Sequence, residues 1–344
     1  MSASSGLFKK GDRILVTGGT GFFGSAILKH LRGSGLKGEF IPDVVVLTRD
    51  PDRFLRGNPD FSRLPWLSFI RGNVGNPEDF PKDRDVEFSH FLHAATDSTL
   101  GPTLKPQLRF DQIVEGTRNA LEFAVRTGVR RFLLTSSGGV YGPQPQNLDR
   151  FPEDYLGIPD PLDAVNSYSI AKRTAEHLSA LFAREFGIEI VVARCFAFVG
   201  EDLPLDVHFA IGNFIRDALW GEEIVVGGDG SPLRSYLDQR DLSEWILTML
   251  ARGQAGRSYN LGSDQAISIS DLATLIRDLL APEKSIRILK KPESGPSRNR
   301  YVPSVDRARD ELGLQIRISL PEAIRAVAAF HRGQSKSLRD IKGR

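Results

Sequence analysis

A tyrosine and a lysine four residues apart, Tyr168 and Lys172, open a helical pattern near the middle of the chain. This spacing places both side chains on one face of a helix. A tyrosine phenol titrates at about 10, and a neighbouring ammonium group lowers that pKa by stabilising the phenolate. The pair can therefore exchange a proton with a carbonyl or alcohol oxygen while a hydride moves. Because Tyr-x-x-x-Lys is also common on solvated helices, the pair alone is a weak signal.

Serine hydroxyls follow the apolar run at residues 132–135, as Ser136 and Ser137. A hydroxyl at the carboxyl end of a strand can hydrogen-bond a substrate oxygen, although a local serine turn explains the same residues.

A glycine-rich segment separates the first apolar run, residues 14–17, from a helical pattern at 22–32. A strand, a glycine turn and a helix in this order are typical of a dinucleotide-binding site. Glycine allows a sharp turn and close approach of a diphosphate, and the helix N-terminus offers N–H groups. The alternative is a plain glycine turn. We predict cofactor contacts from Gly18, Thr20, Gly21, Phe22, Phe23 and Gly24.

The residues after the second apolar run, 44–47, bear on the choice between NAD and NADP. A carboxylate there accepts the ribose 2′-hydroxyl and repels a 2′-phosphate. The chain instead has Thr48 and Arg49, which suit a phosphate and favour NADP(H). If the strand ends two residues later, Asp50 becomes the acid and NAD(H) is the alternative.

Further cofactor contacts are predicted after the third and fourth apolar runs. Asn73 is placed to reach the adenine, although a turn asparagine is an equal alternative. Val74 follows it, and the small side chains of Ala94 and Ala95 allow the cofactor to lie flat on the sheet edge.

Apolar runs alternate with helical patterns through the first half of the chain, which predicts a parallel sheet covered by helices on both faces. The fold class is therefore α/β, a Rossmann-like doubly wound sheet with a smaller, interleaved C-terminal substrate-binding lobe. We expect a dinucleotide-binding domain at 10–200 with return segments near 235–262. The second lobe spans 201–335, and 336–344 form a basic tail that frays from about His331. Strands are expected at 14–17, 44–47, 67–70, 88–93, 132–135, 190–194 and 223–226, and helices at 22–32, 108–127, 167–186, 207–220, 240–252, 270–280 and 320–331.

Composition narrows the functional class. The 344 residues carry a net charge of +2 with both signs mixed, which argues against nucleic acid or a membrane as the main partner. The single cysteine, Cys195, excludes an intramolecular disulfide and fits a reducing compartment. Without an apolar run of membrane-spanning length or a signal-peptide core in residues 1–12, we expect a cytoplasmic protein.

Taken together, the chain resembles the extended short-chain dehydrogenase/reductases, the group of nucleotide-sugar epimerases and dehydratases, from about residue 12 to 332. The segments that show this are TGGTGFFG, HAAT, SSGGVYG, YSIAK, GNFI and GDGSPLRSY. The resemblance implies Ser137, Tyr168 and Lys172 as catalytic residues, with Lys172 also holding the nicotinamide ribose. It implies a nucleotide-sugar substrate whose diphosphate is bound by Asn213, Arg234 and Arg300, with Arg298 as the alternative to Arg300. It implies no metal, and a homodimer formed through the helices at 108–127 and 167–186.

Three departures from the family pattern limit the reaction. Gly138 and Gly139 stand where dehydratases and decarboxylases carry an acidic residue, so both reactions lack their second proton carrier. Ile113 and Ala197 replace asparagines, which removes a proton relay and a polar contact near the substrate. Acidic residues of the loop 144–166, which borders the site, could meet sugar hydroxyls or be solvated.

The favoured function is an NADPH-dependent ketoreductase of a nucleotide-linked 4-keto sugar, such as a 4-keto-6-deoxy sugar. An NAD-dependent nucleotide-sugar 4-epimerase uses the same three residues and is the alternative. A 4,6-dehydratase and a non-catalytic dinucleotide-binding protein rank below both.

Overall fold

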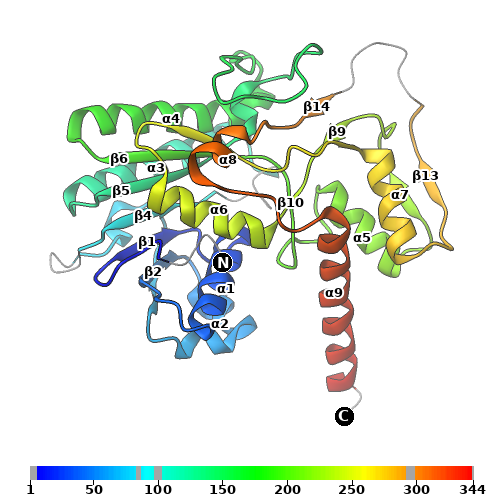
Figure 1. Cartoon of the computed structure of the whole chain (residues 1–344), viewed down its shortest axis with the longest axis horizontal. Coiled ribbons are helices and arrows are strands. Elements are labelled where there is room, and N and C mark those ends of the chain that lie inside the picture. The colour runs from blue at the N-terminus through cyan, green and yellow to red at the C-terminus, as the bar shows by residue number, and fades with distance from the viewer. Residues whose placement is uncertain (1–5, 83–86, 97–102, 292–298, 343–344) are drawn as a thin grey trace.

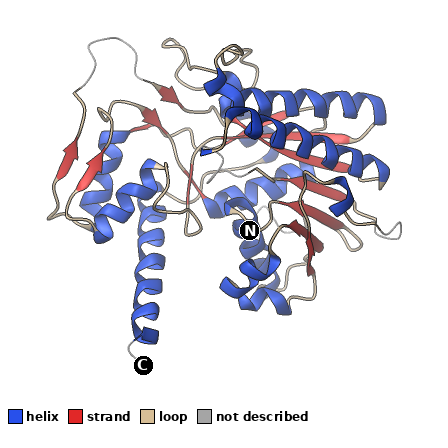
Figure 2. Ribbon diagram, turned by 180° about the vertical axis from the view of Figure 1, so that it is seen from behind, coloured by secondary structure: helices blue, strands red, loops and turns tan. Residues whose placement is uncertain are grey.

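A computed structural model describes residues 6–82, 87–96, 103–291 and 299–342, and its main feature is a seven-stranded sheet (Figure 1). The strand order is β11-β6-β5-β4-β1-β2-β3, and every neighbouring pair is parallel. Helices cover both faces of this sheet, so the predicted Rossmann-like α/β class is confirmed (Figure 2).

The elements of the first half lie close to their predicted positions, except for the short helix α2, which was not predicted. They are β1 (Arg13–Thr17), α1 (Phe22–Leu36), β2 (Asp43–Thr48), α2 (Pro51–Gly57), β3 (Leu67–Arg71), β4 (His90–His93), α3 (Pro106–Arg126), β5 (Arg131–Ser137), α4 (Ser167–Phe186) and β6 (Glu189–Cys195). Short 3₁₀ turns lie at Pro59–Arg63, Pro77–Asp79, Gly138–Tyr141 and Ala164–Asn166.

The second half contains shorter strands. Its elements are β7 (Phe198–Val199), α5 (Ala210–Trp220), β8 (Ile224–Val226), β9 (Leu233–Arg234), β10 (Leu237–Asp238), α6 (Gln239–Arg252), β11 (Ser258–Leu261), β12 (Ile267–Ser268), α7 (Ile269–Leu280), β13 (Ile286–Ile288), β14 (Arg300–Tyr301), α8 (Asp306–Leu312) and α9 (Leu320–Lys342).

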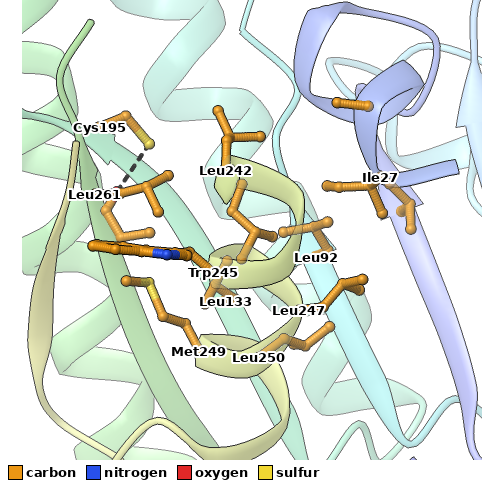
Figure 3. Packing of buried hydrophobic residues seen from close by; sticks show 14 of the residues in the cluster. Ile27, Leu92, Leu133, Cys195, Leu242, Trp245, Leu247, Met249, Leu250 and Leu261 are labelled. Atoms are coloured by element: carbon orange, nitrogen blue, oxygen red, sulfur yellow. Dashed lines mark hydrogen bonds between the residues drawn. The ribbon is translucent and has the colours of Figure 1, made fainter. Parts of the chain in front are cut away.

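The continuous apolar strands are buried because each sheet face has its own helical cover. Leu15 and Val45 belong to a core shared with α3 and α4. Their neighbours Val16 and Val46 point to the opposite face, where α1 and α6 pack. Trp245 of α6 lies on this second core with Leu133 and Leu261 around it (Figure 3). Because successive side chains point to opposite faces, each apolar run contributes to both cores. Because the strands are parallel, their carboxyl ends lie at one edge of the sheet.

Strand β11 joins the main sheet beside β6, while the helices α5, α7 and α9 pack around a third core with β8. Figure 1 shows α5, α7 and α9 beside the main sheet, with β9 and β14 between these helices and the sheet. The division of the chain into two domains near residue 200 stays a prediction.

The C-terminal segment differs from its prediction. Fraying from His331 is wrong, because α9 continues as one helix to Lys342 and extends away from the rest of the chain (Figure 1). Residues 331–342 contain several good helix formers and no proline, so the local sequence permits this extension.

Candidate active site

The glycine segment between β1 and α1 is built for close backbone approach. Gly18 has a φ of +76°, and a Cβ at this position would lie 2.4 Å from the Ala94 carbonyl oxygen at the end of β4. A Cβ on Gly24 would lie 2.2 Å from Gly19 Cα. Gly21 is the N-cap of α1, so the first N–H groups of this helix lack acceptors within the helix. These glycines leave a backbone cradle that suits a diphosphate, although cofactor binding by these residues stays a prediction.

Two aromatic residues of the predicted cofactor site have side chains that serve packing. The Phe23 ring meets Phe198 of β7 edge-on, with 5.1 Å between the ring centroids. Phe22 lies 6.4 Å from the same ring. The backbone N–H groups of these two residues, at the start of α1, remain the atoms that can face a phosphate.

The end of β2 places Thr48, and no carboxylate, at the last position of the strand. The Thr48 and Thr20 hydroxyls hydrogen-bond at 2.8 Å, which joins two predicted cofactor residues. The Asp50 carboxylate accepts a hydrogen bond from the Arg53 N–H and caps α2. Arg71 lies beside Thr48 in the sheet register, and donates to the Arg49 carbonyl and to Asp52. Two arginines therefore lie at this corner, one of which the sequence reasoning missed.

The predicted adenine contact has the geometry of a turn. The Asn73 side-chain oxygen accepts from the Gly75 N–H at 3.0 Å, which favours the turn-asparagine alternative. The Val74 carbonyl accepts from Asn119 of α3 at 3.0 Å. Ala94 and Ala95 follow β4 and are partly buried beside the glycine segment.

Ser137, Tyr168 and Lys172 are brought together at the carboxyl end of β5, as their positions in the sequence predicted. The Ser137 hydroxyl lies beside the Tyr168 phenol, and Ser137 Oγ accepts from the Gly139 N–H at 3.1 Å. Burial and, to a smaller extent, Cys195 raise the pKa of Tyr168, while Ser137 and the Arg109 guanidinium lower it. The net direction is upward. The expectation that a neighbouring cation leaves a low pKa is therefore wrong, because loss of solvent outweighs it in this structure.

The Lys172 ammonium group is buried and held by two oxygen atoms. It donates to Thr96 Oγ1 at 2.8 Å and to the Thr135 carbonyl at 2.7 Å. Burial lowers the pKa of Lys172 from 10.5 to about 8. The ammonium thus stands beneath the ends of β4 and β5, where a bound ribose could accept from it.

The two glycines after Ser137 have their side-chain space filled by other residues. A Cβ on Gly138 would lie 2.6 Å from the Phe196 ring and 2.7 Å from the Tyr301 hydroxyl. A Cβ on Gly139 would lie 2.5 Å from Ser169 Oγ. An acidic side chain at either position would have to displace these groups.

A partly buried network of polar side chains connects Ser136 of β5 to α4 and β6. Ser136 donates to Glu176 at 2.5 Å, and Glu176 forms a two-pronged ion pair with Arg194 of β6. Arg194 also donates to the Tyr141 hydroxyl at 3.0 Å. Through Glu176, which lies four residues after Lys172, these contacts connect helix α4 to strands β5 and β6. Sequence reasoning missed Glu176, although its spacing from Lys172 was visible.

The predicted diphosphate residues occupy different surroundings. Arg234 is partly buried and pairs in register with Tyr301, whose hydroxyl donates to the Cys195 carbonyl at 3.4 Å and lies beside Gly138. Burial lowers the pKa of Arg234 and raises that of Tyr301. Arg234 therefore lies near the reacting groups. Tyr301 was not predicted, because its place depends on the pairing of β14 with β9, which the local sequence does not reveal.

The neighbouring residue Arg300 points the other way, since successive strand residues face opposite sides. It forms an ion pair with Asp149 and donates to the Leu148 carbonyl at 3.3 Å. Asn213 lies in the first turn of α5 and accepts from Arg216 at 3.4 Å. Arg298 lies outside the described residues. Diphosphate binding by Asn213, Arg234 and Arg300 stays a prediction.

The acidic residues of the loop 144–166 make structural contacts. Asp149 and Asp154 pair with Arg300 and Arg307, and Asp163 caps the turn before α4. Glu153 is buried and accepts from the Asn260 N–H at 2.9 Å. These contacts hold the loop against the rest of the chain.

Among the described helices, none is long and apolar enough to cross a membrane. The described residues contain no group of three or more His, Cys, Asp or Glu side chains that could hold a metal ion.

We predict that Lys172→Met stabilises the folded chain by roughly 1–2 kcal/mol at pH 7.5. Because the pKa of Lys172 is lowered, burying the charged ammonium reduces the free energy of unfolding by ~3 kcal/mol below pH 8. The methionine variant removes this cost but also loses two hydrogen bonds, which offset part of the gain. Between pH 8 and 10.5 the unfolded chain binds more protons at this lysine, so the cost falls as the pH rises. Urea unfolding should show the variant's advantage at pH 7.5 and its disappearance near pH 10. A variant less stable than wild type at pH 7.5 would contradict this.

Comparisons with known proteins agree with this arrangement. A family model described as the NAD dependent epimerase/dehydratase family matches residues 14–262. UDP-glucuronic acid decarboxylase 1 from Arabidopsis thaliana is 30% identical over 332 residues, covering 94% of this chain and 71% of that protein.

Two solved structures show the same fold. One is UDP-glucose 4-epimerase from Thermotoga maritima with UDP-glucose, with a TM-score of 0.77 and 24% identity, covering 94% of this chain and 99% of that one. The other is DesIV, a dTDP-glucose 4,6-dehydratase from Streptomyces venezuelae with NAD and TYD bound, with a TM-score of 0.79 and 22% identity, covering 93% and 97%. The family predicted from the motifs is confirmed: the chain belongs to the NAD-dependent epimerase/dehydratase family, within the extended short-chain dehydrogenase/reductases.

Proposed function

We propose that the chain is an NADPH-dependent ketoreductase that reduces a nucleotide-linked 4-keto sugar. The observation on which this rests most is the end of β2, where Thr48 ends the strand and the Asp50 carboxylate is engaged as the N-cap of α2. A carboxylate at this corner would accept a ribose 2′-hydroxyl, whereas a hydroxyl beside Arg49 and Arg71 suits a 2′-phosphate.

The glycines after Ser137 limit the reaction to hydride and single-proton transfer. Water elimination and decarboxylation in this family would use a second acid or base, and Ser169 and Tyr301 fill the space that such a side chain needs at 138 and 139. The relatives named UDP-glucuronic acid decarboxylase support a nucleotide sugar as substrate. We infer that this chain keeps that substrate class with a different reaction.

Each residue of the site has a role in the proposed reduction. NADPH, when bound in the glycine cradle, supplies the hydride to the carbonyl carbon. Ser137 donates a hydrogen bond to the carbonyl oxygen, and Tyr168 gives its phenolic proton to the same oxygen as the alcohol forms. Lys172 donates to the nicotinamide ribose, and Arg234 pairs with the diphosphate of the sugar nucleotide.

The test begins with the purified protein as isolated. We denature it and identify any dinucleotide that is released. The proposal expects an exchangeable site that is empty or holds NADP(H), and NADPH binding at least tenfold tighter than NADH binding by titration. Stoichiometric, tightly held NAD would overturn the reductase and favour the 4-epimerase, which must keep its cofactor through both hydride transfers.

We also infer a homodimer formed through α3 and α4. These helices pack side by side on one face of the sheet, and Leu108 and Leu181 are exposed on them. Light scattering at micromolar concentration should give twice the chain mass, and a monomer would contradict the proposal. The buried, lone Cys195 supports a reducing, cytoplasmic location.

A further inference from the structure

A second positive side chain lies against the proposed proton donor. Arg109 is in the first turn of α3, and its guanidinium carbon stands 4.2 Å from the centre of the Tyr168 ring. A cation within about 6 Å of an aromatic face is attracted by the ring. Helices α3 and α4 run side by side in both views, so Arg109 reaches Tyr168 across the space between two neighbouring helices (Figures 1 and 2).

Lys172 is the other cation near this tyrosine, but its ammonium is directed at two oxygen atoms. Its hydrogen bonds go to Thr96 Oγ1 and to the Thr135 carbonyl. Arg109, by contrast, covers the ring face itself. Of the two cations, Arg109 is therefore the one that acts on the Tyr168 phenol in this structure.

Among the residues that the structure describes, the other titratable groups that act on Tyr168 are the Cys195 thiol on β6 and the Tyr301 phenol on β14. The His208 imidazole, before α5, lies near Arg109. Burial raises the pKa of Cys195 to about 12 and also that of Tyr301, while burial and Arg109 lower that of His208. Glu176, near Lys172, is held by Arg194 and Ser136.

We propose that Arg109 is a positioning residue for proton transfer, and that its guanidinium stabilises the phenolate of Tyr168 electrostatically. In the reduction, the Tyr168 O–H bond breaks as a new O–H bond forms on the oxygen of the reduced carbonyl, and the negative charge passes to the phenol oxygen. Solvent then returns a proton to that oxygen. The consequence for catalysis rests on the proposed function, but the electrostatic effect does not.

The test measures Tyr168 directly. The chain has six tyrosines, and labelling them with ¹³C at the ring carbon that bears oxygen gives one signal for each. Comparison with Tyr168→Phe identifies the Tyr168 signal, which is followed from pH 7 to 11.5. Because burial already raises the pKa of Tyr168, the readout is the pH at which its signal begins to shift. We expect Arg109→Met to move this onset upward by about half a pH unit or more, and Arg109→Lys to restore at least half of the change.

A matched control and a fold check make the outcome decisive. Arg118→Met removes an exposed arginine from the same helix and should leave the Tyr168 titration unchanged. Thermal unfolding of each variant verifies that it is folded, and if Arg109→Met is not folded, Arg109→Gln replaces it. An unchanged onset of the Tyr168 signal shift in the folded, uncharged variant would overturn the proposal. Because no substrate is needed, a failure of the ketoreductase proposal would leave this result intact.

Discussion

Tyr168→Phe is expected to lower the rate of hydride transfer by roughly 100- to 10,000-fold, because it removes the phenol that supplies the proton. The ring and its contact with Arg109 remain, so folding and cofactor affinity should stay close to wild type. Single-turnover oxidation of NADPH with saturating keto sugar measures the step, and equilibrium titration with NADPH measures binding.

Tyr155→Phe is the control for this variant. Tyr155 lies in the loop before α4 and packs against Tyr141 and Phe151, so loss of its hydroxyl should leave the rate within about twofold. A Tyr168→Phe variant that kept the full rate would contradict the assigned proton donor, whichever sugar is the substrate.

Gly18→Ala is expected to weaken dinucleotide binding by about 100-fold or more. The new Cβ would meet the Ala94 carbonyl oxygen at 2.4 Å, and the φ of +76° is unfavourable for any residue with a side chain. The loop must then move away from the position that brings its backbone close to a diphosphate. Calorimetric titration with NADPH and with NADH should show the loss for both cofactors.

Gly33→Ala tests whether this effect is local. Gly33 lies in α1, and an added Cβ there has nothing within 4 Å. It should bind NADPH as wild type does, and gain roughly 0.5–1 kcal/mol of stability from the helix propensity of alanine. Equal affinity of Gly18→Ala and Gly33→Ala for NADPH would rule out the glycine cradle as the diphosphate site.

The sheet was predictable because each strand is a nearly continuous apolar run between helical patterns. The same runs located Ser137 and Ala94 at one edge of the sheet, since parallel strands end together. The Tyr168–Lys172 spacing placed the second half of the site on one helix face. In these cases local sequence determines both the element and the side from which a side chain reaches the site.

The rest of the site comes from distant segments, which no local pattern reveals. Tyr301 lies beside Gly138, the residue after Ser137, because β14 pairs with β9, more than 60 residues earlier in the chain. Arg109 reaches Tyr168 from another helix. The upward pKa of Tyr168 was missed for the same reason, because burial depends on how these segments close over the ring. The extent of α9 was also unpredictable from its basic composition.

The most direct test of the proposed reaction follows the hydride itself. The protein is incubated with NADPH deuterated at the transferred position of C4 and a nucleotide-linked 4-keto sugar. We expect one deuterium at the new carbinol carbon of the sugar for each NADPH oxidised. Conversion of a nucleotide sugar to its 4-epimer without net NADPH oxidation, or release of CO2 from a nucleotide-linked uronic acid, would contradict the ketoreductase.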